Sequence, residues 1–294
     1  MTIRYIDHVL IAVPDLDAAA EQYRKLGFHV TAGGTHPDRG TANRLVVLED
    51  GYLELIAVHD RTAAWPELVR HLDQNGPGLF TFAFGSSDLD ADVARFRSRN
   101  AEGITSLQAE EPQEGELVTS GAKRRGWRSS RVSGGERVNP FLIQHDSTDE
   151  EKRLKLFGDH PPQSHPLGYG RIERLEVVFP SLEEGEAYFR DGYGLSRVGE
   201  QSVCPSRQGD RIFFPLAQGQ LEVIAPNSPD SPLNDFVSQR KYGVRGVVLT
   251  VPDLDGAASY LAGQGIRINR SPISGAVQID PADALGARLV LVKE

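Results

Sequence analysis

The sequence predicts an α+β protein built from four β-α-β-β-β modules that fall into two pairs. Three observations support this class: an alternating apolar motif occurs four times, a helical pattern follows each copy, and a second apolar motif recurs at nearly the same distance from the first. Repetition of this kind indicates repeated structural units. The 294 residues, 39% hydrophobic and 25% charged, suffice for two globular domains.

The first motif predicts a strand that leads directly into a helix. Its four copies are "IDHVLIAVPDL" (6–16), "LFTFAFGSSDL" (79–89), "IERLEVVFPSL" (172–182) and "VRGVVLTVPDL" (244–254). Alternating apolar residues are typical of a strand with one buried face. The Asp or Ser before each final Leu is a typical helix N-cap, so a helix is expected to start at each Leu.

The second motif predicts the last strand of each module. "GYLELIAV" (51–58) closes the first module and matches "GQLEVIAP" (219–226) in the third. "NPFLIQHD" (139–146) and "GARLVLV" (286–292) have the same apolar shape in the other two modules. We therefore expect the first module pair over 1–146 and the second over 168–294. The linker between them, 147–167, is expected to begin with a short charged helix.

The composition excludes several classes of function. A formal net charge of −9 without long Lys/Arg runs does not favour nucleic acid or an anionic membrane as a partner. The single cysteine, Cys204, excludes an internal disulfide and a multi-thiolate metal site within one chain. No apolar stretch approaches the roughly 18 residues of a membrane span, and the N-terminus lacks the apolar core of a signal peptide. We expect a cytoplasmic protein that binds a small molecule, with a homodimer left open.

The paired modules resemble the vicinal-oxygen-chelate superfamily, which includes glyoxalase I, extradiol dioxygenases, fosfomycin-resistance enzymes and bleomycin-binding proteins. The first half resembles its glyoxalase-like domain branch, through "DHVLIAVPDLD", "GGTHPDRGTANRLV", "GYLELIAV", "GWRSSRV", "NPFLIQHD" and "HPLG". The second half resembles the superfamily through the module pattern only. The resemblance implies that each pair of modules curls into a half-open barrel. It also implies that a divalent metal binds in the concave cleft, held by the first and last strands of a module.

His8 and Glu54 are predicted to face this cleft together. In the first strand Val9, Ile11 and Val13 form an apolar row that should pack on the helix, so His8 points to the opposite face. The same alternation places Glu54 in the cleft. An imidazole and a carboxylate are suitable ligands for Zn, Fe, Mn or Ni. The alternative is a structural pair in which His8 donates a hydrogen bond to Glu54.

The other modules do not repeat this pair. The positions equivalent to His8 and Glu54 hold Thr81 and Leu142, Arg174 and Glu222, and Gly246 and Val290. Gln144, which shares the predicted face of Leu142, offers an amide oxygen as a third metal ligand. His145 is expected on the opposite face. With one histidine at such a position, neither an extradiol dioxygenase nor a complete glyoxalase I site fits the sequence.

The loop "GGTHPDRGTANRLV" (33–46) is expected to border the pocket, as the family resemblance implies. His36, Thr41 and Asn43 bring hydrogen-bonding groups close to the first module. The catalytic candidates are Glu54 and His36, and the substrate-binding candidates are Thr41, Asn43 and Trp127. A locally bonded turn and an ordinary core tryptophan remain the alternatives for the loop and for Trp127.

The second module pair carries a different cluster. Alternation places Arg174, Glu176 and Glu222 in its cleft, without any histidine. An arginine between two acids is typical of a buried ion-pair network. We interpret this half as a degenerate pair with a structural role, and a small polar ligand site is the alternative.

The sequence favours an enzyme of the superfamily whose divalent metal is held by His8, Glu54 and Gln144. It would act as a lyase, an isomerase or a ring-opening enzyme on a small oxygenated metabolite bound in the first barrel. The competing hypothesis is a metal-free protein of bleomycin-resistance type that binds or sequesters a small molecule.

Overall fold

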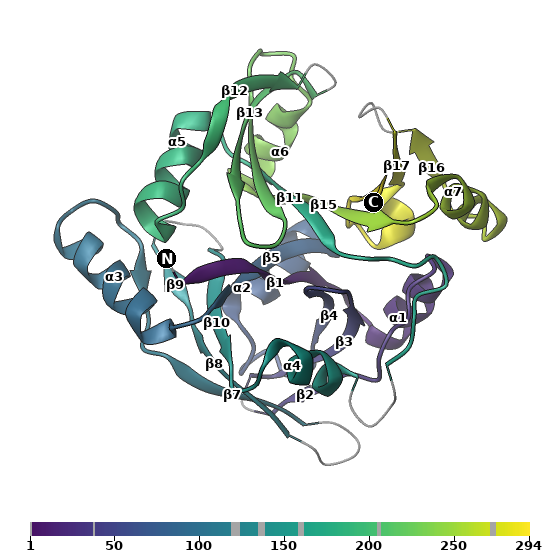
Figure 1. Cartoon of the computed structure of the whole chain (residues 1–294), viewed down its shortest axis with the longest axis horizontal. Helices are drawn as coiled ribbons and strands as arrows, with labels where there is room; N and C mark the ends of the chain where they lie inside the picture. Colours follow the sequence, from purple (N-terminus) through teal and green to yellow (C-terminus); the bar gives the residue numbers. More distant parts are fainter. Residues whose placement is uncertain are drawn as a thin grey trace.

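The computed structural model describes residues 2–37, 39–118, 124–134, 139–157, 162–204, 207–270 and 275–294. In this described part, the strands form two eight-stranded sheets and one short two-stranded sheet (Figure 1). No helix there is both long and apolar enough to cross a membrane.

The first large sheet is a closed barrel with the strand order β1-β4-β3-β2-β7-β8-β10-β5. Its strands are β1 (Ile3–Ala12), β2 (Gly34–His36), β3 (Thr41–Val47), β4 (Tyr52–Val58), β5 (Gly78–Ser86), β7 (Gln113–Val118), β8 (Arg124–Ser130) and β10 (Phe141–His145). The barrel closes where Thr35 of β2 pairs with Val118 of β7. The short β6 (Gln108–Ala109) and β9 (Val132–Ser133) pair with each other.

The second large sheet has the same internal order, β12-β13-β14-β11-β15-β18-β17-β16. Its strands are β11 (Ile172–Val178), β12 (Val198–Cys204), β13 (Gly209–Pro215), β14 (Gln220–Pro226), β15 (Gly243–Val251), β16 (Ile268–Arg270), β17 (Ala276–Ile279) and β18 (Leu289–Lys293). In each module the first strand pairs in parallel with the last, as in β1–β4 and β11–β14. The α+β class with four repeated modules in two pairs is therefore confirmed.

One helix follows the first strand of every module, as the repeat predicts. These helices are α1 (Leu16–Lys25), α3 (Leu89–Ala101), α5 (Leu182–Ala187) and α7 (Leu254–Gly263). Each begins at the predicted Leu, and the preceding Asp15, Asp88, Ser181 or Asp253 accepts a backbone N–H of the first turn. A π-helical turn, η1 (Tyr188–Tyr193), continues α5.

Three further helices connect the modules, and a short 3₁₀ helix, η3 (Pro281–Ala284), precedes β18. The connecting helices are α2 (Pro66–Asn75), α4 (Asp149–Leu156) and α6 (Leu233–Arg240). The charged helix expected after residue 147 is α4, which begins with a capping box between Thr148 and Glu151. Its Leu156 packs against Leu45 and Tyr52 of the barrel.

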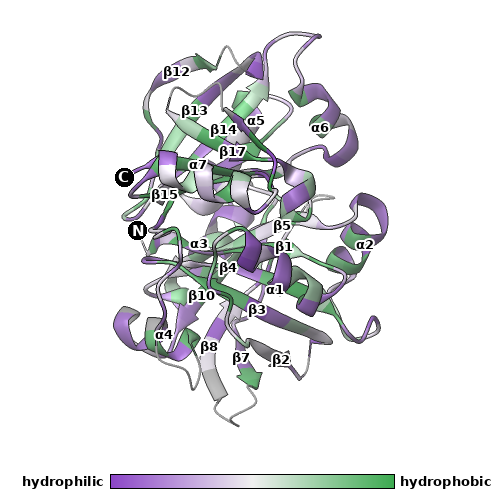
Figure 2. Ribbon diagram, turned by 90° about the vertical axis from the view of Figure 1, so that its right-hand side faces the viewer, coloured by the Kyte–Doolittle hydropathy of each residue, from purple (hydrophilic) through white to green (hydrophobic). Residues whose placement is uncertain are grey.

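The outer faces of both sheets pack with the helices in one continuous apolar core. This core includes Val9 and Ile11 of β1 together with Leu175 and Val177 of β11, on the faces that alternation predicts. Figure 2 shows the strands of the second sheet above those of the barrel. A separate apolar cluster that includes Leu10 lies inside the barrel. The predicted boundaries at 146 and 168 remain a prediction.

Candidate functional site

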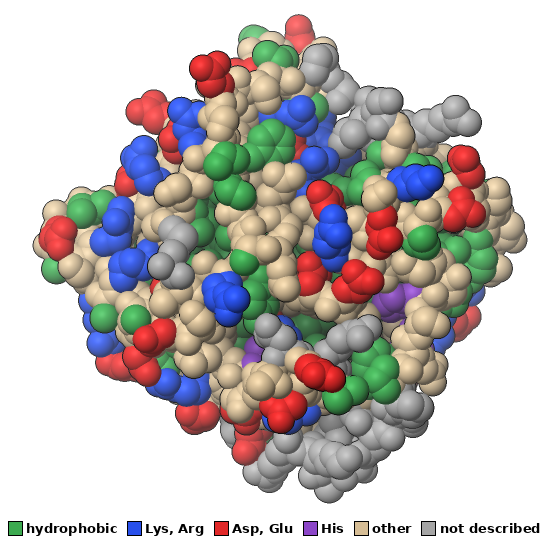
Figure 3. Space-filling model, in the orientation of Figure 1, with side chains coloured by type: hydrophobic (Ala, Val, Ile, Leu, Met, Phe, Trp, Pro, Cys, Tyr) green, Lys and Arg blue, Asp and Glu red, His purple; other side chains and the backbone are tan. Residues whose placement is uncertain are grey.

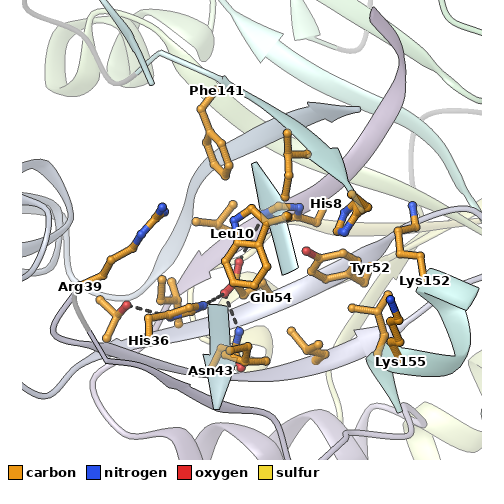
Figure 4. Close-up of a pocket in the computed structure, with 18 of the residues that line it drawn as sticks. His8, Leu10, His36, Arg39, Asn43, Tyr52, Glu54, Phe141, Lys152 and Lys155 are labelled. Atoms are coloured by element: carbon orange, nitrogen blue, oxygen red, sulfur yellow. Dashed lines mark hydrogen bonds and ion pairs between the residues drawn. The ribbon is translucent and has the colours of Figure 1, made fainter. Parts of the chain in front are cut away.

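The interior of the first barrel holds a cavity with about 830 Å³ of empty space that is open to solvent. Its wall is mainly apolar and aromatic. The predicted site residues that line it are His8, His36, Thr41, Asn43, Glu54 and Trp127. Figure 4 shows His8, His36 and Asn43 arranged around Glu54, with Lys152 and Lys155 further along the wall. The structure therefore brings six of the seven predicted site residues together.

Glu54 is the centre of the polar wall. The Nδ2 atom of Asn43 donates to its Oε1 at 2.8 Å. The Nε2 atom of His8 lies 3.4 Å from Oε2, and the Nε2 atom of His36 lies 3.9 Å from Oε1. Glu54 is 6% exposed, so one carboxylate and two imidazoles meet at a buried part of the cavity wall.

The register of three strands produces this meeting. Leu10 of β1 pairs with Glu54 of β4, which places His8 one inward step away along β1. On its other side β4 pairs with β3, where Leu45 is opposite Glu54. The next inward residue of β3 is Asn43, close enough to donate to the carboxylate. Alternation predicted the shared face of His8 and Glu54. Asn43 was expected in a loop beside the pocket and lies instead on β3.

His8 is held by a second carboxylate that the sequence did not indicate. Its Nδ1 lies 2.8 Å from Oδ1 of Asp7, and its ring stacks on Tyr52 with ring centroids 4.5 Å apart. Burial raises the pKa of Asp7, but the charges of His145 and Lys152 outweigh it and hold this pKa well below its usual value. An ionised Asp7 accepts only, so Nδ1 of His8 donates to it. In neutral His8, the Nε2 atom that faces Glu54 then carries no proton.

His36 is oriented by its partner on the neighbouring strand. The segment 33–46, expected as a loop, largely forms β2 and β3, which pair His36 with Thr41. The Nδ1 atom of His36 lies 2.9 Å from Oγ1 of Thr41, which leaves Nε2 facing Glu54. Burial lowers the pKa of His36 from its ordinary value, against the opposing effect of Glu54. We therefore expect a neutral imidazole at pH 7.

Gln144 is the predicted site residue that the structure does not bring to the others. Its Oε1 accepts the backbone N–H of Leu89, at the start of α3 outside the barrel. His145 instead lines the cavity, with Nε2 3.1 Å from Oδ2 of Asp7. The predicted faces of Gln144 and His145 were therefore wrong. The reason is that β10 is apolar on both faces, since Phe141 points into the barrel and Leu142 into the outer core.

The register of β10 also corrects the equivalence between modules. In the first module, Leu10 of β1 pairs with Glu54 of β4 and, on its other side, with Thr81 of β5. In the aligned motif of the second module, the residue that corresponds to Leu10 is Ala83 of β5. Ala83 pairs with Phe141 of β10. The counterpart of Glu54 in the second module is thus Phe141, one residue before the predicted Leu142. An apolar ring stands where a second carboxylate would be.

The donor set of the cavity does not fit the catalytic metal that the superfamily resemblance implies. A catalytic zinc site takes three protein ligands. Gln144 lies outside, and the remaining donors His8, His36 and Glu54 contact one another directly, with the Nε2 atoms of the two histidines 3.4 Å and 3.9 Å from the carboxylate. Among the described residues, no group of three or more His, Cys, Asp or Glu side chains is arranged to hold a metal ion. Glu54 is instead hydrogen-bonded by Asn43, as a carboxylate without a metal requires.

Asp7 and Lys152 are functional candidates that sequence reasoning missed. The register between β1 and β5 shifts between Ile6 and His8, so Asp7 is a bulge residue. Its Oδ2 lies 3.1 Å from Nζ of Lys152 on α4, and both side chains are buried. An acid directly before the histidine was the available signal for Asp7. Nothing local predicted Lys152, which lies in the segment assigned as a linker.

Gly33→Ala is expected to destabilise the fold more than Gly103→Ala does. Both glycines have positive φ, +61° and +71°, so each substitution carries the backbone cost of about 1–2 kcal/mol. At Gly33 a Cβ would also overlap the carbonyl oxygen of Asn43, whereas at Gly103 nothing lies within 4 Å. Urea denaturation of the two variants separates the steric cost from the backbone cost. Equal losses of stability would show that the loop at Gly33 yields freely.

Comparisons with known proteins give one family and several relatives. The sequence model of the glyoxalase-like domain family matches residues 6–191. The mitochondrial methylmalonyl-CoA epimerase of Bos taurus is 28% identical over 110 residues, which are 37% of this chain and 62% of that protein. The chain matches 55–62% of the length of three such mammalian epimerases.

Two solved structures share the whole fold. A hypothetical protein from Staphylococcus aureus is 13% identical with a TM-score of 0.69, over 98% of this chain and 99% of that one. A mutant of 4-hydroxymandelate synthase from Streptomyces coelicolor is 14% identical with a TM-score of 0.65, over 100% of this chain and 93% of that one. At these identities the likeness concerns the fold alone.

Proposed function

This chain belongs to the glyoxalase-like domain family, and on that premise we propose that its first barrel is the active site of an enzyme that transfers a proton at a carbon beside a carbonyl group. The observation that carries the proposal is the meeting of Glu54 with the imidazoles of His8 and His36. A carboxylate and imidazoles within reach of one reacting atom are the groups of general acid–base catalysis.

Each of the three side chains has a role in this scheme. Glu54 removes the proton, and the electron pair of the C–H bond moves onto the carbonyl oxygen. In the tautomer in which Oγ1 of Thr41 donates to Nδ1, His36 presents Nε2–H to that developing oxyanion. His8, whose Nδ1 donates to Asp7, presents an unprotonated Nε2 to Glu54 and accepts the proton that Glu54 has taken, for exchange with solvent.

The charge of the cavity indicates an anionic substrate. Arg39 and Lys155 line it, as does Lys152, whose charge is paired with Asp7, and Glu54 is the acidic side chain among its lining residues. A carboxylate or phosphate group of a substrate would complement these cations. The apolar and aromatic part of the wall suits a small organic body. The relatives named methylmalonyl-CoA epimerase support the same class, because an acyl-CoA combines a carbonyl-activated carbon with anionic groups.

The test is exchange of a substrate proton with deuterium from solvent, followed by NMR. The panel contains methylmalonyl-CoA, other 2-substituted acyl-CoA thioesters and the corresponding free acids. We expect exchange at the carbon beside the carbonyl of at least one compound. No step uses a metal ion, so dialysis against a chelator is expected to leave the rate unchanged. Loss of exchange with the chelator, restored by a divalent metal, would overturn the metal-free scheme.

The aromatic wall supports a second candidate, a protein that binds a small molecule without turning it over. Trp65, Trp127, Phe141 and Tyr52 all line the cavity. Aromatic side chains provide a large contact area for a planar compound. Compounds of the panel that bind without proton exchange would favour this function over the enzyme.

Ligand binding in the barrel is expected to change the intrinsic tryptophan fluorescence. The chain has two tryptophans, Trp65 and Trp127, and both line the cavity. Emission excited at 295 nm should therefore follow saturation of this cavity, and Trp127→Phe should remove part of the change. A ligand that saturates by calorimetry while the emission stays constant would place its site outside the barrel.

A further inference from the structure

The concave face of the second sheet carries five arginines around two buried glutamates. Glu176 and Glu222 are both fully buried. Arg174, Arg211 and Arg245 lie on β11, β13 and β15, whereas Arg207 lies between β12 and β13 and Arg288 directly precedes β18. Figure 3 shows Lys and Arg side chains grouped beside β13, on the side toward β17 in Figure 1.

This cluster occupies the place of the first barrel's site in the repeated module. Glu176 pairs with Glu222 as Leu10 pairs with Glu54, so Glu222 is the counterpart of Glu54. By the same register Arg174 is the counterpart of His8. The sheet therefore keeps the carboxylate of the active-site position and replaces the imidazole with a guanidinium.

Each of the two carboxylates contacts three of the arginines. Glu222 lies 2.9 Å from Nε of Arg174, 3.3 Å from Nη1 of Arg211 and 3.4 Å from Nη1 of Arg207. Glu176 accepts from Arg207 and Arg288, and its Oε2 lies 3.4 Å from Nη1 of Arg245. Arg207 bridges the two acids.

The two carboxylates leave three of the five positive charges uncompensated. Buried charges are expensive unless they are paired. The side chains of Arg174, Arg211 and Arg245 are 14%, 26% and 22% exposed, so the surplus lies at the open side of the face. Each guanidinium has five N–H donors, and the contacts with Glu176 and Glu222 use few of them.

The pKa values of the cluster reflect the same excess of positive charge. Burial, together with the like charges of Arg245 and Arg207, lowers the pKa of Arg288 to about 10 despite Glu176. Burial also lowers the pKa of Arg245. On the acid side, Arg288 and Arg207 outweigh burial and hold the pKa of Glu176 below its usual value. Glu176 is thus ionised, and the arginines around it still repel one another.

We propose that the concave face of the second sheet binds a small multivalent oxyanion, a phosphate or a polycarboxylate, through the open N–H groups of Arg211, Arg245 and Arg174. Planar guanidiniums at fixed angles match the oxygens of phosphate and carboxylate groups. The buried Arg207 and Arg288 hold the acids that position the outer arginines. The site lies apart from the barrel cavity and does not depend on the function proposed there.

The test measures the thermal stability of the full chain at pH 7 in sodium phosphate and in sodium citrate. Sodium chloride of the same ionic strength is the reference. An anion that binds the folded chain raises the Tm in a saturable way. We expect such a rise with at least one anion, and the active anion identifies phosphate or polycarboxylate as the ligand class. No saturable rise with either anion overturns the proposal.

A double variant, Arg211→Gln with Arg245→Gln, locates the site. It is expected to weaken the apparent affinity at least tenfold, while a matched double variant, Arg190→Gln with Arg267→Gln, keeps it. The control arginines lie in the same half and pair with exposed or partly exposed acids. An unchanged affinity in the first double variant would place the anion elsewhere and refute the assignment.

Two further measurements use the wild-type protein, with the arginine cluster unsubstituted. Phosphate or citrate should protect Arg211 and Arg245 of the wild-type protein from phenylglyoxal, as read by peptide mass spectrometry, even if the double variant does not fold. Tryptophan emission should stay constant during the anion titration, because both tryptophans lie in the barrel. Unprotected arginines, or an emission change that parallels the Tm, would contradict the proposal.

Discussion

Glu54→Gln is expected to slow deuterium exchange by about 10²–10⁴-fold while the KM for the same compound changes little. The amide has nearly the same shape, and its oxygen can still accept the hydrogen bond of Asn43. It cannot take a proton from carbon, so the substitution removes an interaction that matters in the transition state. Initial rates over a range of substrate concentrations separate kcat from KM.

The control for this substitution is Glu114→Gln. Glu114 lies on β7 of the same barrel, but its side chain is 80% exposed and pairs only loosely with Arg128. The same chemical change there should leave both constants unaltered. If Glu54→Gln instead raises KM and leaves kcat intact, Glu54 binds substrate and does not act as the base.

The fold and the centre of the site were predictable because β1 and β4 each have a clear apolar row. Val9 and Ile11 mark the outer face of β1, so the position of His8 follows from alternation alone. On β10 both faces are apolar, and alternation could not tell Leu142 from Phe141. The error in placing Gln144 follows directly from that ambiguity.

The contacts that sequence reasoning missed are those between residues far apart in the chain. Lys152 meets Asp7 across 145 positions, and Arg288 meets Glu176 across 112. Such pairs depend on the packing of α4 on the barrel and on the register of β15 with β18. The local hydrophobic pattern of the sequence contains no information about this packing or this register. The surplus of arginines on the second sheet therefore became visible only when four strands and the segments that hold Arg207 and Arg288 were placed together.

Asp7→Asn is expected to lower the free energy of unfolding by about 3–5 kcal/mol at pH 7, because it leaves Lys152 buried without its carboxylate. Asp7 and Lys152 are 0% and 6% exposed, so water cannot replace the lost partner. Urea denaturation monitored by circular dichroism measures the loss. The matched control is Asp146→Asn, which removes an exposed partner of Lys155 on the same helix and should cost less than about 1 kcal/mol.

A second substitution should rescue part of this loss. In Asp7→Asn with Lys152→Met, neither member of the pair remains charged, so no unpaired ammonium group is buried. We expect the double variant to be more stable than Asp7→Asn alone. If the stability losses of Asp7→Asn and Lys152→Met add up in the double variant, the buried charge of Lys152 is stabilised by groups other than Asp7.

The pH dependence of this loss follows from the pKa of each partner. The pKa of Asp7 is lower in the folded chain, so its contribution is complete above the unfolded value of about 3.9 and is lost as the pH falls below it. The pKa of Lys152 is raised to about 12, because Asp7 and Tyr5 outweigh the opposing effect of burial. Its contribution is complete below the unfolded value of about 10.4 and is lost as the pH rises through 12. The deficit of Asp7→Asn relative to wild type should therefore be present at pH 7 and shrink below about pH 4. A deficit that grows on acidification would mean that Asp7 is protonated in the folded chain, and the hydrogen bond that fixes Nδ1 of His8 would then need another acceptor.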